Sequence, residues 1–225
     1  MPTDEAVVRA QARREAAPAV AAVLVVLAAV AIVSRSHGWE LLGLSWWVWL
    51  VLAAPALLLA IDLLLAVRGE GLVRTRKAAL VLLGLLVAGN FVALGILVAG
   101  LVTASTSDLS GGELLLTGFA IYTSDVVVFG LIFWELEAGG PVARRRAPER
   151  DALDFRFPQD DAGARSWKPQ AWDYLYVSLT NSIAFSPTDT MPLSLRAKAL
   201  MGLESFVSAV TILLVAARAV NVLGS

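Results

Sequence analysis

The chain has 225 residues, of which 58% are hydrophobic and 16% charged, and its formal net charge is −1. Because the apolar residues come in long blocks, this composition excludes a soluble domain and predicts a helical membrane protein that crosses the bilayer several times. The absence of cysteine excludes disulfides, thiolate metal sites and thiol catalysis. No basic face interleaved with aromatic residues appears, so nothing indicates a nucleic-acid partner.

The first part of the chain predicts a polar N-terminal tail, residues 1–15, followed by a four-helix membrane region, residues 16–137. A helix needs about 20 largely apolar residues to cross a bilayer core. The blocks that meet this requirement here are residues 16–33, 41–67, 78–102 and 114–134. The first block follows several arginines, as a signal peptide does, but it is long for one and SRSHGW is a poor cleavage context. We therefore interpret it as a retained span.

Residues 138–170 are the one long polar connection. They combine low hydrophobicity with many charges of both signs, which predicts a mobile charged loop rather than a folded domain. We expect the triplet Arg144–Arg146 within it to face lipid headgroups as a basic cluster.

Residues 171–225 predict a half-helix, a polar loop and a final transmembrane helix. The apolar segment 174–185 is too short to cross the bilayer core, so a segment of this kind must return on the side from which it entered. Irregular backbone at that depth is tolerated only where protein or water satisfies its polar groups. The predicted fold is thus an all-α membrane protein, with five transmembrane helices plus a re-entrant pore-type half-helix before the last one.

The charged loops predict an orientation. Basic residues gather in residues 1–15, 68–77 and 138–170, whereas the opposite side carries only Arg35 and Arg218. The positive-inside rule then places the N-terminus and the 138–170 loop in the cytoplasm. The alanine- and arginine-rich usage suggests a bacterial cytoplasmic (plasma) membrane.

The C-terminal hairpin resembles the pore module of tetrameric potassium channels. The matching positions, aligned without a gap, are Tyr176-x-Ser178, Asp189-x-x-Pro192, Lys198 and Leu203-Glu204. The resemblance implies a homotetramer with its pore loops around one axis, and a largely structural role for Glu204. The whole chain also looks like small uncharacterised bacterial integral membrane proteins that end in such a hairpin.

The filter signature of that module, T-V-G-Y-G, is not kept: its positions are Ala184 to Thr188. Glycines let successive carbonyls face the pore axis, because they reach positive φ without steric cost. Pro187 fixes φ at about −65° and the β-branched Thr188 resists positive φ, so we expect no potassium filter of the usual build. The wider pathway that we expect instead is lined by side-chain oxygens of Thr180, Asn181, Ser182, Ser186, Thr188, Asp189 and Thr190.

Two acids, Asp125 and Glu204, are predicted to lie inside the membrane. A carboxylate at the centre of a membrane helix costs about 2.5–3.5 kcal/mol on insertion scales, so each must face protein or water, or be protonated. An ion or proton site is one interpretation, and a buried polar anchor is the other.

The sequence therefore predicts an ion-channel-like protein in the lipid bilayer that forms a homotetramer and conducts monovalent cations with weak selectivity. Two alternatives stay open: an ion- or proton-coupled small transporter that uses Asp125 and Glu204, and a non-conducting scaffold or sensor. We expect no enzyme, metal site or cofactor. The chain has one histidine, His37, and lacks a P-loop, an H-E-x-x-H motif or a glycine-rich nucleotide fingerprint.

Overall fold

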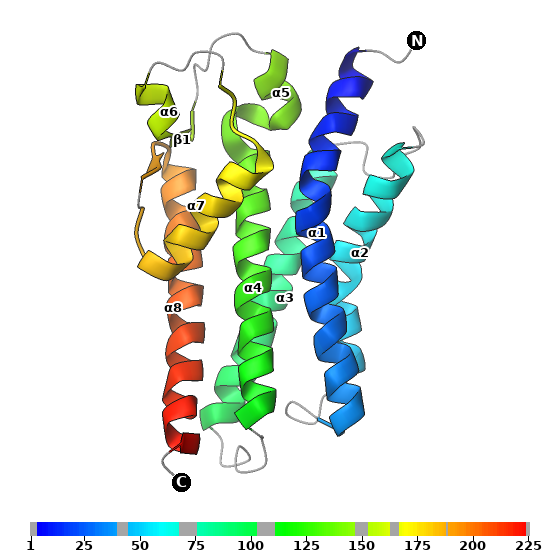
Figure 1. Cartoon of the computed structure of the whole chain (residues 1–225), viewed down its shortest axis with the longest axis vertical. Coiled ribbons are helices and arrows are strands. Elements are labelled where there is room, and N and C mark those ends of the chain that lie inside the picture. Colours follow the sequence, from blue (N-terminus) through cyan, green and yellow to red (C-terminus); the bar gives the residue numbers. More distant parts are fainter. Residues whose placement is uncertain are drawn as a thin grey trace.

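The computed structural model describes residues 4–39, 45–67, 76–102, 111–146, 153–162, 167–187 and 189–223. Long helices dominate it (Figure 1): α1 (Asp4–His37), α2 (Trp47–Val67), α3 (Arg76–Val102), α4 (Gly111–Leu136) and α8 (Leu195–Leu223). The shorter elements between α4 and α8 are η2 (Glu137–Gly139), α5 (Pro141–Arg146), β1 (Phe155–Arg156), α6 (Pro158–Asp161), α7 (Ala171–Ala184) and β2 (Met191–Pro192).

By helix length and hydropathy the chain is a multi-pass membrane protein. The described residues contain four stretches long and apolar enough to cross a membrane: Ala10–His37, Arg76–Ala99, Leu114–Gly139 and Leu195–Ala217. In α2 the apolar stretch is shorter, Trp47–Asp62, and residues 41–44, where the predicted second span begins, lie outside the described residues. The predicted all-helical membrane class is confirmed.

Helix α4 is the centre of the bundle, because it contacts α1, α3, α7 and α8. In the most apolar part of α4, 67% of the stretch is buried inside the protein, whereas in the other three spanning helices this share is 28% to 39%. The close approach of α7 requires a glycine, since a Cβ at Gly130 would lie 2.9 Å from Leu175 Cα and 3.2 Å from Tyr174 O. Backbone atoms cannot give way as a side chain does, so this glycine sets the distance between α4 and α7.

Helix α7 leaves the end of the bundle at which α5 and α6 lie, runs obliquely along α4 and ends partway along α8 (Figure 1). It begins where Asp173 accepts a hydrogen bond from the Gln170 backbone N–H, at 2.7 Å. It ends at Phe185, whose backbone is left-handed (φ 54°, ψ 26°). The chain then returns to the same end, where β2 pairs antiparallel with β1.

Between α4 and α7, where the sequence predicts a mobile loop, the described residues form η2, α5, β1 and α6. Phe155 and Phe157 are buried there. Their rings lie 6.1 Å and 5.3 Å from that of Tyr174 on α7, and Phe155 lies 5.2 Å from Phe133 on α4. This aromatic cluster attaches the connection to the start of α7.

Candidate intramembrane polar site

A buried hydrogen-bond network joins α4, α7 and α8 around Glu204. Asn181 Nδ2 donates to Glu204 Oε2 at 2.7 Å and to Met201 O at 3.0 Å. Ser178 Oγ contacts Glu204 Oε1 and donates to Val126 O at 2.6 Å. Ser178, Asn181 and Glu204 are each at most 1% exposed, so the network ties the half-helix to both neighbours away from lipid.

Glu204 accepts hydrogen bonds from two side chains of α7, Ser178 and Asn181. A serine hydroxyl has one proton, which Ser178 shares between Glu204 and the backbone carbonyl of Val126 on α4. The carboxyl group therefore holds the half-helix against α8.

A second polar group lies on α4 itself, where Asp125 is 1% exposed. Asn90 of α3 lies beside it, but no hydrogen bond of good geometry joins the amide to the carboxyl group. Glu204 is close enough for the two carboxyl groups to interact electrostatically. Both carboxyl oxygens of Asp125 are buried without a hydrogen-bond partner, as are Ser124 Oγ, Ser208 Oγ and Asn90 Nδ2.

The predicted pore-lining residues do not lie together. Asn181 is part of the Glu204 network, and Ser182 Oγ is hydrogen-bonded to Tyr122 Oη at 2.8 Å on the side facing α4. Thr180 donates to carbonyls of its own helix. Thr190 is buried, 3% exposed, and Thr188 lies outside the described residues. This leaves Ser186 and Asp189 as the described members that are exposed on the turn.

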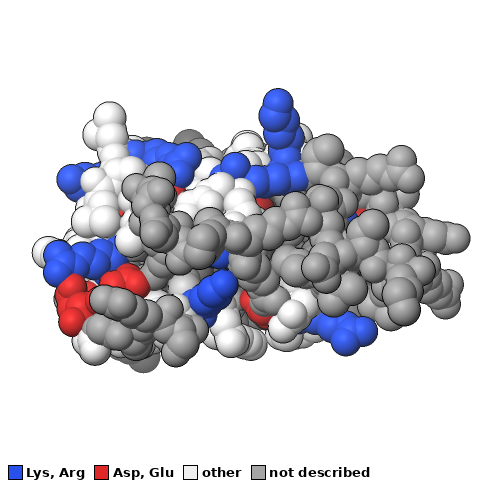
Figure 2. Space-filling model, turned by 90° about the horizontal axis from the view of Figure 1, so that it is seen from above, with Lys and Arg blue, Asp and Glu red and all other residues white. Residues whose placement is uncertain are grey.

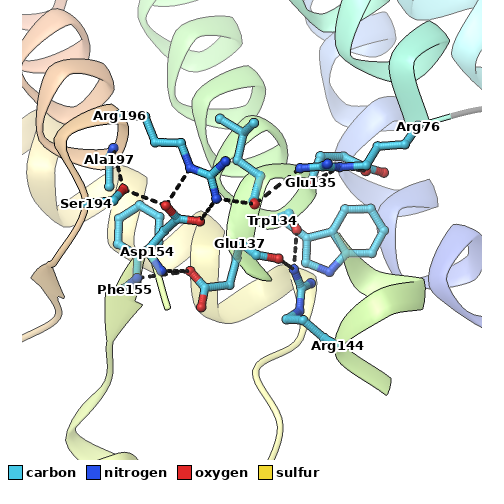
Figure 3. Close-up of polar contacts among 11 residues, drawn as sticks. Arg76, Trp134, Glu135, Glu137, Arg144, Asp154, Phe155, Ser194, Arg196 and Ala197 are labelled. Atoms are coloured by element: carbon cyan, nitrogen blue, oxygen red, sulfur yellow. Dashed lines mark hydrogen bonds and ion pairs between the residues drawn. The ribbon is translucent and has the colours of Figure 1, made fainter. Parts of the chain in front are cut away.

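The end of α4 carries a cluster that sequence reasoning missed, in which three arginines from three elements bind its last carbonyls (Figure 3). Arg76 donates to Glu135 O at 2.8 Å and to Leu136 O at 3.2 Å. Arg144 donates to Trp134 O at 2.6 Å and to Glu137 O at 2.8 Å. Arg196 donates to Leu136 O at 3.3 Å.

The last carbonyls of a helix generally lack partners within it, and the helix dipole favours cations at this end. The arginine cluster therefore caps α4 and fixes α3, α5 and α8 around its end. Arg144 is 7% exposed and its guanidinium lies 5.2 Å from the Tyr174 ring centroid. The prediction that Arg144 faces lipid headgroups was wrong, because its guanidinium is bound inside the protein by the backbone carbonyls of Trp134 and Glu137.

Two acids complete this cluster (Figure 3). Glu137 Oε2 accepts the backbone N–H groups of Asp154 and Phe155, at 3.0 Å and 2.9 Å. Asp154 forms a salt bridge with Arg196 and accepts the hydroxyl of Ser194. Burial alone raises the pKa of Asp154, but the hydrogen bonds from Arg196 and Ser194 and the charge of Arg196 outweigh it, and the net pKa is lowered from 3.8.

Figure 2 shows the end of the molecule at which this cluster lies, with Lys and Arg side chains spread over its described surface. Exposed basic residues at this end are Arg14, Arg76, Lys77, Arg156, Lys168, Arg196 and Lys198. At the opposite end Arg35 is exposed, over the Trp46 ring at 4.9 Å. The helix bundle thus has one basic end, from which α7 enters and to which β2 returns (Figure 1).

The fold and the buried polar groups define a polytopic α-helical membrane protein. Within the described part of the chain, no group of three or more His, Asp or Glu side chains could hold a metal ion. Comparison with protein-family models, with curated proteins and with solved structures finds no match to this chain.

Proposed function

We propose that the protein is a channel-like homo-oligomer in which the α7–α8 hairpins of several copies surround a pathway for monovalent cations. The observation that carries the proposal is the exposed turn at the end of α7. Phe185, Ser186, Pro187 and Asp189 are exposed, and the turn lies partway along the spanning helices (Figure 1). Irregular polar backbone does not face lipid at membrane depth, so another copy or a water-filled cavity must cover it.

The outer face of α7 supports self-association. Its exposed large side chains, Trp172, Tyr176, Leu179 and Ile183, recur at helical spacing and form one continuous stripe. The opposite face packs on α4 and α8. On α8, a Cβ added at Gly202 would meet nothing within 4 Å, and this glycine lies one turn before the exposed Phe206. Small residues of this kind allow helices of neighbouring copies to approach closely in lipid.

The hairpin enters from the basic end of the bundle, and the positive-inside rule places that end in the cytoplasm. The orientation that we propose is therefore inverted relative to that of potassium channels. In a symmetric oligomer the Asp189 carboxylates would form a ring at the mouth of the pathway, and such rings attract cations. The pathway would be shaped by side chains, because the filter positions contain no glycine.

Two measurements on the full chain test this proposal. Particle mass in detergent, with the detergent subtracted, should correspond to a tetramer. Vesicles that contain the protein should show cation flux with similar rates for Na⁺ and K⁺, and Asp189→Asn should reduce that flux several-fold. Asp161→Asn is the matched control, since Asp161 is an exposed acid on α6, and it should leave the flux unchanged.

A monomer in both detergent and lipid nanodiscs would contradict the shared pathway. Equal flux in the Asp189→Asn and Asp161→Asn variants would contradict the role of the carboxylate ring. A strong preference for K⁺ over Na⁺ would show that the argument from the missing glycines is wrong.

A further inference from the structure

We propose that each copy of the chain also binds a monovalent cation of the Na⁺ class between α3, α4 and α8, at Asp125. This site lies inside one protomer and uses no residue of the α7–α8 turn. It is therefore independent of the oligomeric pathway proposed above.

Asp125 differs from the other buried acids of the described chain in its lack of a well-formed hydrogen bond or ion pair. Asp62 pairs with Arg13 at 3.2 Å. Glu137 accepts two backbone N–H groups, Asp154 pairs with Arg196, and Glu204 is bound by side chains of α7. Both oxygens of Asp125 are buried with no hydrogen bond of good geometry. An uncompensated buried charge costs several kcal/mol, so the ionised form of Asp125 needs a cation beside it.

Two buried hydroxyl groups on α4 and α8 indicate the class of cation. Ser124 Oγ and Ser208 Oγ are buried and unpartnered. Ser208 follows Glu204 by one helical turn, on the same face of α8, and Glu204 is the residue of that helix that interacts with Asp125. Hydroxyl and carboxylate oxygens are hard ligands that suit Na⁺, whereas transition metals favour nitrogen or sulfur and Ca²⁺ favours several carboxylates.

The Asn90 amide fits this ligand set. Its Nδ2 is buried without a partner, and the two ends of an amide group are assigned from the hydrogen bonds that they make. Turning the amide by half a turn presents Oδ1 to Asp125 and adds a further oxygen ligand from α3. The site then joins three helices around one positive charge.

Thermal unfolding of the full chain in detergent tests the site, with NaCl, KCl and choline chloride compared at equal ionic strength. A cation that binds the folded state alone raises the stability with the logarithm of its concentration above Kd. We expect Tm to rise with Na⁺ but not with choline, and we expect Asp125→Asn to abolish this rise. Asp161→Asn should keep the full response.

If Asp125→Asn does not fold, Ser208→Ala provides the test, because it keeps the carboxylate and removes one ligand. It should raise the half-saturating Na⁺ concentration about tenfold, the effect of roughly 1.4 kcal/mol of lost binding free energy. Equal Tm values in all three salts would overturn the proposal, as would a Na⁺ response that survives Asp125→Asn. A monomeric particle would refute the shared pathway and leave this response intact, so the two proposals fail separately.

Discussion

The contact between α4 and α7 predicts a specific cost for Gly130→Ala. The added Cβ would lie 2.7 Å from Leu175 Cδ2, 2.9 Å from Leu175 Cα and 3.2 Å from Tyr174 O. The Leu175 side chain can rotate away, but the two backbone atoms cannot. Because carbon atoms pack at about 3.5–4.0 Å, α7 must move from α4 by about 0.6–1.1 Å at this point.

That movement strains contacts on both sides of Gly130. Ser178 donates to Val126 O at 2.6 Å one turn away, and the Tyr174 ring packs against Phe155 and Phe157. Overpacking of this kind costs about 1–3 kcal/mol. At about 2–4 °C per kcal/mol for a chain of this length, Tm should fall by about 2–12 °C.

Gly84→Ala is the matched control, because nothing lies within 4 Å of a Cβ at Gly84 on α3. Alanine is favoured over glycine in a helix by about 0.8–1.0 kcal/mol, so this variant should unfold at the same temperature as the wild type or slightly above it. The assay is thermal unfolding in one detergent at one salt concentration. If Gly130→Ala and Gly84→Ala unfold together, α7 does not lie against α4 as described.

Two further predictions concern the buried acids. Glu204→Gln should keep more of the wild-type stability than Glu204→Ala, because the amide can accept from Asn181 and donate to Ser178. Glu204→Ala should cost about 1–3 kcal/mol by removing a buried hydrogen-bond partner of both side chains; equal Tm values for the two variants would contradict the role of Glu204 in this network. The pKa of Asp154 is lowered from its ordinary value of 3.8. Its pairing with Arg196 therefore stabilises the folded state fully at pH values above 3.8, and this stabilisation is lost as the pH falls through the lowered pKa. Asp154→Asn should therefore be less stable at neutral pH, and its deficit in unfolding free energy should narrow below pH 3.8; a deficit that stays constant with pH would refute this.

Hydropathy predicted the helices because it is a local property of the sequence. The segment predicted to be too short to span, 174–185, corresponds to α7. The arginine cluster could not be found in this way, since Arg76 and the carbonyl oxygens that it binds are 59 and 60 residues apart. Backbone carbonyls also carry no sequence signal, so a basic residue that caps a helix looks the same as one that faces water or lipid.

The placement of Asn181 and Ser182 shows a second limit. Polar residues on a helix usually mark the face away from the protein interior, and here they suggested a pore-lining surface. In α7 the buried face carries Ser178, Asn181 and Ser182, while Trp172 and Ile183 are exposed. In a membrane this preference is reversed, because lipid cannot form hydrogen bonds with a polar side chain and only protein or water can. The helical spacing was readable from the sequence, but the direction in which each face points was not.

The turn after α7 qualifies the argument from the missing glycines. A residue with positive φ is present, but it is Phe185, at φ 54°, where a helix commonly ends with glycine in the left-handed region. The left-handed conformation is disfavoured for phenylalanine by about 1–2 kcal/mol, and among the described residues of the turn it is used once, to end the helix. A potassium filter needs successive carbonyls facing one axis, and a single left-handed residue at a helix end reverses the chain without aligning them. The missing glycines therefore do not prevent the chain from turning. In the pathway proposed above, the side chains of the turn, above all Ser186 and Asp189, would be the groups that a cation meets.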